Sequence, residues 1–467
     1  MFKIFNKEEK HQTHGLHIII VGCGKVGQTL VEKLSNEGHD ITIVDKNGQI
    51  IKELTEQYDI MGIVGNGASY SVLMEAGVKN ADLIIAVTES DELNLLCCTV
   101  GKRVSECSAI ARVRTPDYNA EVNYLKDKLG LAMIINPELE AAIEASRILY
   151  LPNALEVNSF AHGQAEMVKF QIPEGNVMDN LSIAELGQKT KSSYLICGIE
   201  RDDEFFIPDG NFVTKAGDSV SFVAARSSIR NFFKEIGFAT NHVRNTLIIG
   251  GGKAAYYLGK ILIDMGVEVR IIESNKERCE ELSILLPKAT IINGDGTDQE
   301  LLAEEDLAHT DSFVPLTGID EENILLTLHA KKHSKAKVIT KINRINFKDV
   351  INDLHLGSVI YPRYITAQSI LAYVRAKNNS IDNNSIETLC PMFDSRAEAI
   401  EFIVWEDTGL TNIAFKDLSI KKNVLVAFIN RNGNIIIPGG NDMLLPGDTV
   451  MIVTSHTGFN RLRDILN

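Results

Sequence analysis

The sequence predicts an α/β protein in which a Rossmann-like parallel-sheet domain and a small α+β domain occur twice, in the order A-B-A-B. Three observations support this. The apolar strand and glycine loop at 17–27 recur at 245–255, with Gly22 matched by Gly250, a shift of 228 residues. Short apolar runs alternate with amphipathic segments in both copies, as in βαβ units. The 467 residues are enough for two to four domains of about 100 to 200 residues each.

The composition argues against nucleic-acid-binding, membrane-spanning and secreted proteins. The apolar fraction is 45%, the charged fraction 23% and the mean hydropathy near zero, which is typical of a packed soluble protein. The net charge of −15 argues against a nucleic-acid partner. The apolar runs are strand-sized, so we expect no transmembrane segment. Residues 1–14 lack the apolar core of a secretory signal, and the seven cysteines contain no CxxC pair. We therefore expect a cytosolic protein with reduced thiols.

Further landmarks recur and place the domain limits. Residues 65–67 match 294–296 and residues 91–94 match 320–323, while 206–210 and 216–220 return as 436–440 and 446–450. A polar segment at 378–385 is typical of a linker. The prediction is an extension at 1–14, Rossmann-like domains at 15–151 and 241–378, and small α+β domains at 152–240 and 379–467.

Within the first half, strands are expected near 17–21, 41–44, 61–64, 83–87 and 109–113. The first helix is expected near 25–37, ending at Gly38, a suitable C-cap residue. The smaller domains contain alternating runs such as 219–223 and few long helical windows, which favours a small α+β regulatory fold.

The loop Gly22-x-Gly24-x-x-Gly27 follows a strand and opens a helix, which is the context of a dinucleotide-binding loop. Gly22 allows the tight turn, Gly24 lets a pyrophosphate approach the helix N-terminus, and Gly27 brings helix and strand together. Asp45, at the end of the second strand, would accept hydrogen bonds from ribose hydroxyls and repel a 2′-phosphate. This favours NAD(H) or ATP over NADP. The alternative is a tight turn without a ligand.

The second half has the variant loop Gly250-x-Gly252-x-x-Ala255, with Glu273 as the acid. Lys25 and Lys253 occupy equivalent loop positions, where each would either neutralise a phosphate or be solvated.

Residues that follow later strands extend the candidate sites. Thr88 and Thr317 would either bind ligand or cap the next segment. Arg112 and Arg114 are expected at the carboxyl edge of the sheet, where open α/β sheets bind ligands; a surface ion pair is the alternative for Arg114. Their counterparts in the second half are Lys341 and Asn343.

The usual catalytic motifs are absent. The sequence has no HExxH metal motif, no GxSxG elbow and no GxxxxGK[ST] loop. A dehydrogenase would need an acid–base residue beside the nicotinamide, and the smaller domains offer none that recurs. We therefore expect no catalytic residue, no metal site and a switch driven by nucleotide occupancy. The alternatives are an NAD-dependent oxidoreductase with a duplicated Rossmann domain and a nucleotide-responsive scaffold for a different transporter.

The residues at 18–27, the acid in Val44-Asp45, and the runs 86–94 and 111–118 resemble the TrkA family of Trk potassium-uptake regulators. The resemblance extends from Leu16 over nearly the whole chain. It includes the order of two RCK nucleotide-binding domains, each followed by an RCK C-terminal domain.

The resemblance implies a regulatory subunit on the cytosolic face of the cell membrane. It would gate a Trk-type potassium channel or transporter when NAD(H), ATP or ADP binds to a ring of RCK domains, formed by a homodimer or homotetramer. Some relatives bind cyclic dinucleotides through the smaller domains, but no residue of those domains carries that property over. The extension at 1–14 precedes the usual start of the family and is expected to be a tail; a membrane or channel contact is the alternative.

By the same resemblance, the first nucleotide site consists of Gly22, Cys23, Gly24, Lys25, Val26, Asp45, Asn66, Gly67 and Arg112. The second consists of Gly250, Gly251, Gly252, Lys253, Ala254, Glu273, Asp295, Gly296 and Lys341. Two departures, Ala255 in place of the third glycine and Lys341 in place of Arg112, leave the affinity and preference of the second site open.

Overall fold

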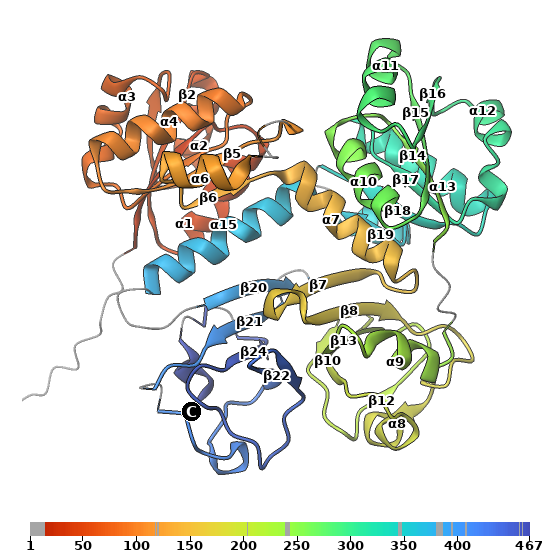
Figure 1. Cartoon of the computed structure of the whole chain (residues 1–467). Helices are drawn as coiled ribbons and strands as arrows, with labels where there is room; N and C mark the ends of the chain where they lie inside the picture. Colours follow the sequence, from red (N-terminus) through yellow and green to blue (C-terminus); the bar gives the residue numbers. More distant parts are fainter. Residues whose placement is uncertain are drawn as a thin grey trace, which may run out of the picture. The chain divides into compact units, whose positions relative to one another are not determined.

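The computed structural model describes residues 15–467 except 117, 119–120, 203, 239–242, 344–347, 380–385, 394–395, 407–408, 457 and 460. It forms two compact units, which divide between Asn136 and Pro137 (Figure 1). The predicted extension at 1–14 and most of the predicted linker at 378–385 lie outside the described residues. The four domain limits stay predictions from the sequence.

The first unit is built on a parallel six-stranded sheet in the order β3-β2-β1-β4-β5-β6. The central strands β1 and β4 are almost wholly apolar and buried, as expected for a sheet covered on both faces. The order reverses between β1 and β4, which places the ligand-binding crevice of such folds at their carboxyl ends. The strands are β1 (His17–Val21), β2 (Asp40–Asp45), β3 (Met61–Val64), β4 (Leu83–Ala86), β5 (Ser108–Arg112) and β6 (Met133–Ile135).

Side-chain caps and a glycine with positive φ mark the ends of several first-unit helices. Gly38 follows α1 with a φ of +79°, a conformation that glycine adopts at no steric cost. Asn47 caps α2 by accepting a hydrogen bond from the Gln49 amide, and Ser90 caps α4 through the Leu93 amide. The helices are α1 (Lys25–Asn36), α2 (Gly48–Gln57), α3 (Tyr70–Glu75), α4 (Asp91–Val104) and α6 (Val122–Leu129).

The second unit opens with α7 (Pro137–Tyr150) and an antiparallel sheet in the order β11-β10-β13-β8-β7. Phe170, Phe222, Phe232 and Phe233 fill its core with edge-to-face and tilted ring contacts. The elements are β7 (Glu156–Phe160), β8 (Ala165–Gln171), β9 (Leu181–Ser182), α8 (Ile183–Lys189), β10 (Leu195–Arg201), β11 (Glu204–Phe206), β12 (Val213–Thr214), β13 (Ser219–Ala225) and α9 (Ile229–Glu235).

A second parallel sheet repeats the first, in the order β16-β15-β14-β17-β18-β19. The predicted duplication of a Rossmann-like fold is thus confirmed. The strands are β14 (Asn245–Ile249), β15 (Glu268–Glu273), β16 (Thr290–Asn293), β17 (Ser312–Pro315), β18 (Lys337–Lys341) and β19 (Ser358–Ile360). The helices are α10 (Lys253–Asp264), α11 (Lys276–Leu285), α12 (Gln299–Glu304), α13 (Asp320–His333), α14 (Lys348–Asp353) and α15 (Pro362–Asn379).

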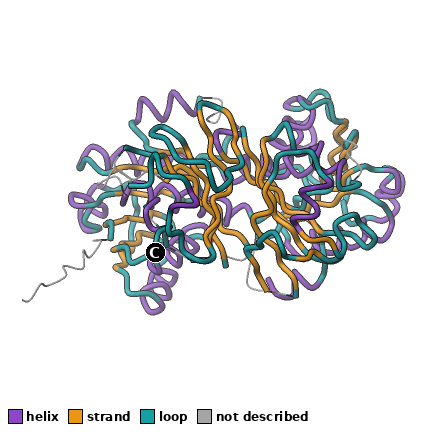
Figure 2. Tube along the Cα trace, turned by 90° about the horizontal axis from the view of Figure 1, so that it is seen from below, coloured by secondary structure: helices purple, strands orange, loops and turns teal. Residues whose placement is uncertain are grey.

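The chain ends in a second antiparallel sheet, ordered β20-β21-β24-β22-β23. Both antiparallel sheets keep a buried aspartate held by two guanidinium nitrogens, Asp218 by Arg201 and Asp448 by Arg431. The strands are β20 (Ile386–Met392), β21 (Ala397–Ile403), β22 (Val424–Arg431), β23 (Asn434–Ile436) and β24 (Thr449–Thr454), and the described residues after α15 include 3-10 helices but no α-helix. The alternation of helices and strands can be followed in Figure 2.

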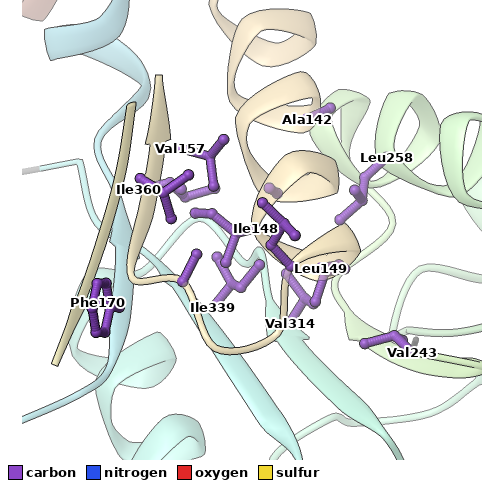
Figure 3. Close-up of a cluster of buried hydrophobic side chains, with 14 of the residues drawn as sticks. Ala142, Ile148, Leu149, Val157, Phe170, Val243, Leu258, Val314, Ile339 and Ile360 are labelled. Atoms are coloured by element: carbon purple, nitrogen blue, oxygen red, sulfur yellow. The ribbon is translucent and has the colours of Figure 1, made fainter. Parts of the chain in front are cut away.

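Within the second unit, α7 packs along α10, the helix that follows the second glycine loop. Figure 3 shows Ala142, Ile148 and Leu149 of α7 close to Leu258 of α10, in a core that also contains Ile339 of β18. All five side chains are at most 2% exposed. In the described part of the chain, no helix combines the length and apolar character that crossing a bilayer requires.

Candidate functional site

The glycine loop of the first half connects β1 to α1 in a turn that needs glycine at its first and last positions. Gly22 has a φ of +96°, and its amide donates to the Val44 carbonyl at 2.8 Å. A Cβ on Gly22 would lie 2.8 Å from the Thr88 nitrogen, and one on Gly27 would lie 2.1 Å from the Gly22 oxygen. These two glycines are therefore explained by the packing of the protein itself.

Gly24 is different. Its φ of −65° and ψ of −170° suit any residue, and a Cβ built on it meets no atom within 4 Å. Gly24 is also the N-cap of α1, and no side chain caps this helix end. The first-turn amides of α1 thus adjoin open space, which is the arrangement that binds phosphate in Rossmann folds.

Asp45 holds the loop from the end of β2. One carboxylate oxygen accepts the Cys23 amide at 2.6 Å and the other accepts the Asn47 amide at 2.8 Å. The predicted ribose acid therefore also has a structural role, while each oxygen keeps a second lone pair for a ligand hydroxyl. The Cys23 thiol is buried, and burial together with the Asp45 charge raises its pKa to about 12. Cys23 can contribute only backbone groups to a ligand site.

The other predicted residues of the first half either shape the loop after β3 or lie within the glycine loop and α1. Gly67 lies against the end of β1, because a Cβ there would come within 2.1 Å of Val21, and Asn66 turns this loop by accepting the Ala68 amide. Lys25 is exposed beside the loop. Val26 is buried, so only its backbone is available to a ligand.

Thr88 and Arg112 belong to a network that centres on Asn94, a fully buried residue of α4. The Asn94 carbonyl oxygen accepts the Thr88 amide at 2.8 Å and the Thr88 hydroxyl at 2.7 Å. Its amide nitrogen donates to the carbonyl oxygens of Thr88 and Arg112, and the Arg112 guanidinium donates to the Thr88 carbonyl. The ends of β4 and β5 are thereby tied together beside the glycine loop.

Asn94 was missed as a functional residue, although its motif was noted as a landmark of the repeat. Asp91 of the same motif accepts the amides of Arg114 and Thr115. The Arg114 guanidinium lies 3.8 Å from the Asp91 carboxylate, so the ion-pair alternative describes its contact.

The second half repeats this geometry. Gly250 has a φ of +93° and donates its amide to the Ile272 carbonyl at 2.8 Å. Gly252 is the N-cap of α10 without a side-chain cap, and its Cβ would again meet nothing within 4 Å. Ala255 is buried, so this loop accommodates the Cβ that the first loop excludes at Gly27. Ala254 is also buried and can offer only its backbone.

Glu273 has a longer side chain than Asp45, and the residue that its carboxylate binds in the loop is a glycine, Gly251, in place of Cys23. Its carboxylate accepts the Gly251 amide at 2.6 Å and the Asn275 amide at 2.7 Å, as Asp45 does for Cys23 and Asn47. A Cβ on Gly251 would lie 3.0 Å from the Glu273 carboxylate and 2.5 Å from Leu282. The pair Glu273 and Gly251 thus replaces the pair Asp45 and Cys23.

The remaining residues of the second half follow the same plan. Asn323 binds the Thr317 amide and hydroxyl and the Lys341 carbonyl, as Asn94 does in the first half. The Lys341 ammonium donates to the Leu316 carbonyl at 2.9 Å, and burial lowers its pKa, partly offset by Glu138 and Asp320. Asp295 turns its loop by accepting the Thr297 amide. Gly296 approaches Ile249 as Gly67 approaches Val21.

We call the loop 22–27 with Asp45 the first cradle, and the loop 250–255 with Glu273 the second cradle. In each, glycine loop, acid, threonine and basic residue meet at the carboxyl edge of one parallel sheet, where the strand order reverses. These features define a class of protein with two Rossmann-like folds, each followed by a domain built on an antiparallel sheet.

Comparisons with known proteins specify the class further. The TrkA-N domain family model matches residues 18–137 and 246–362, and the TrkA-C domain family model matches residues 167–237 and 399–467. The chain belongs to the TrkA family, as the resemblance predicted.

Relatives match over nearly the whole chain. A Trk system potassium uptake protein TrkA homolog of Archaeoglobus fulgidus is 31% identical over 96% of this chain and 100% of its own length. The Trk system potassium uptake protein TrkA of Halomonas elongata is 30% identical over 96% of this chain and 98% of its own length. These relatives are named as potassium uptake proteins and not as enzymes, which confirms the prediction that the chain is not an enzyme.

Solved structures share the fold. The GsuK channel bound to NAD aligns with a TM-score of 0.62 and 17% identity, covering 95% of this chain and 77% of the channel chain. The GsuK RCK domain aligns with a TM-score of 0.62 and 18% identity, covering 95% of this chain and 93% of that domain. At these identities the likeness describes the fold alone.

Proposed function

We propose that the chain is the cytoplasmic regulatory subunit of a Trk-type potassium uptake system. It binds NAD(H), or alternatively ATP or ADP, in its two cradles and gates a membrane potassium channel or transporter, on whose inner face it assembles as a homodimer or homotetramer. The observation that carries the proposal is the open space beside Gly24 and Gly252, at two helix ends that lack a side-chain cap, in a chain of the TrkA family.

The contacts of the cradles support separate roles for their residues in binding the phosphates and the ribose. Amides of the glycine loop and of the first turn of α1 or α10 would hold the diphosphate, with Lys25 or Lys253 beside it. Asp45 or Glu273 would accept the ribose hydroxyls. Thr88 and Arg112, or Thr317 and Lys341, would border the rest of the ligand at the adjoining strand ends. The GsuK channel is described as bound to NAD, which makes NAD(H) the first ligand to test.

Regulation requires that two conformations bind the nucleotide with different affinity. In the second unit, α10 begins at the second cradle and packs along α7 through fully buried side chains. A tightly packed interface transmits small displacements, because it cannot deform continuously. Closure of the second cradle on a nucleotide would therefore move α10 and, with it, α7. This is the route by which we expect nucleotide occupancy to reach the membrane partner.

Deleting the gene is expected to impair growth at low external potassium and to leave growth at high potassium unchanged. The physical reason is that the inward driving force for potassium is smallest at low external concentration, where loss of a regulated uptake route has its largest effect. The measurement is the initial rate of potassium uptake in the deletion strain, with the strain complemented by the full chain as the control. Uptake with unchanged KM and maximal rate in the deletion strain would contradict the proposed function.

A further inference from the structure

In the two cradles, equivalent carbonyl groups of the glycine loop accept hydrogen bonds from chemically different side chains. In the first half, the Gln28 side-chain amide of α1 donates to the Cys23 carbonyl at 3.0 Å. In the second half, the Arg278 guanidinium of α11 donates through Nε to the Gly251 carbonyl at 2.7 Å. A neutral amide is thus replaced by a fixed positive charge at the loop.

Arg278 is firmly placed. Its backbone amide donates to the side chain of Asn275, the N-cap of α11. Its guanidinium also contacts the Glu281 carboxylate at 2.6 Å, and the side chain is only 23% exposed. The two guanidinium contacts use two of its five N–H groups. Arg278 is therefore held at the loop while part of its surface faces solvent.

Arg278 and the ribose acid meet at one residue. The Glu273 carboxylate accepts the Gly251 amide at 2.6 Å, and Arg278 binds the carbonyl of the same residue. In Rossmann folds the acid at this position binds the ribose 2′-hydroxyl and repels a 2′-phosphate, whereas a nearby arginine accommodates that phosphate. The second cradle has both groups on either side of Gly251.

The first cradle offers no equivalent. Ile50 stands at the position that corresponds to Arg278. Lys46 follows Asp45 directly but is exposed, and a lysine ammonium is a hydrated point charge on a flexible stem. An arginine fixed at two atoms presents a planar set of donors that matches phosphate geometry. The Glu281 carboxylate is 58% exposed, so its ion pair with Arg278 is weak and a phosphate can share the guanidinium.

We propose that Arg278 is a specificity-determining residue that lets the second cradle accept an adenine dinucleotide carrying a 2′-phosphate, the NADP(H) class, which the first cradle excludes. This inference rests on the proposed function, because it requires the second cradle to bind a nucleotide. It gives the two halves different ligands, so that one chain responds to two nucleotide pools.

The test measures NADH and NADPH binding by calorimetry on the full chain carrying Gly24→Val, which closes the first cradle. NADPH is expected to bind the second cradle at least as tightly as NADH. Adding Arg278→Gln should weaken NADPH about tenfold or more, since a charge-assisted hydrogen bond is lost, and should change NADH affinity less than about threefold. Lys276→Gln is the matched control, since it removes an exposed charge from the same helix turn; it should leave both affinities unchanged.

Each other outcome has a distinct meaning. Equal weakening of NADH and NADPH by Arg278→Gln would overturn the inference and leave Arg278 as a brace of the loop. NADH binding without NADPH binding would also overturn it, while the proposed function stands. If the folded Gly24→Val chain binds neither nucleotide, nucleotide binding by the second half is refuted, and the inference with it. The reference is the chain with Gly252→Val, in which the first cradle should bind NADH and exclude NADPH.

Discussion

Replacing Gly24 with valine is expected to abolish nucleotide binding by the first cradle and to lower the free energy of unfolding by only about 1 kcal/mol, because valine is a poorer N-cap residue than glycine. The backbone at Gly24 is extended, and the added Cβ meets no protein atom within 4 Å. The side chain would instead fill the space at the N-terminus of α1 in which we propose that the diphosphate binds. We expect the affinity to fall more than about 100-fold, or about 2.7 kcal/mol. Calorimetry with NADH and thermal unfolding measure the two effects.

Gly27→Val is the contrasting control. Its Cβ would lie 2.1 Å from the Gly22 carbonyl oxygen, so this variant should lower the free energy of unfolding. The first cradle can be isolated in a chain that also carries Gly252→Val. Unchanged NADH affinity of the first cradle after Gly24→Val would refute the phosphate role of its glycine loop.

Asn94→Ala is expected to destabilise the first unit by about 2 to 4 kcal/mol, because the part-buried Thr88 amide and Arg112 carbonyl lose the Asn94 side chain as a hydrogen-bond partner. The Thr88 amide and the carbonyls of Thr88 and Arg112 all bind the Asn94 side chain. Hydrogen exchange of the β4 and β5 amides measures the local loss of stability.

The chain supplies two comparisons for this prediction. Asn323→Ala should have a similar effect on β17 and β18, because Asn323 binds Thr317 and the Lys341 carbonyl in the same way. Leu96→Ala should have little effect, because Leu96 lies on the same helix with 51% of its surface exposed. A loss below about 1 kcal/mol for Asn94→Ala would mean that the network does not hold these strand ends together.

Two Rossmann-like sheets could be predicted from the repeated glycine loop and acid together with the short apolar runs around them. Such runs indicate parallel strands, because a parallel sheet is covered on both faces and its strands are therefore apolar throughout. The short edge strand β6 was not predicted, since its three residues, Met133–Ile135, carry too little pattern. The packing of α7 on α10 joins segments more than 100 residues apart in the sequence, and periodicity contains no information about such partners.

The candidate site was predicted through its motif and not through its supporting residues. Asn94 and Asn323 occupy matching positions 229 residues apart, one more than the shift between the glycine loops. This match was the available signal, but the spacing alone does not show what a buried asparagine does. Arg278 has no counterpart in the first half, so the repeat could not draw attention to it. Its role depends on a contact with the Gly251 carbonyl, which only the folded chain brings about.

The dependence of transport on nucleotide occupancy can be measured as potassium uptake in a deletion strain that expresses the chain with both Gly24→Val and Gly252→Val. We expect this chain to accumulate in folded form and to bind neither NADH nor NADPH. Uptake at low potassium should stay at the level of the deletion strain, whereas the unaltered chain should restore it. Uptake restored to the level of the unaltered chain by the doubly substituted protein would show that nucleotide occupancy of the cradles does not control transport.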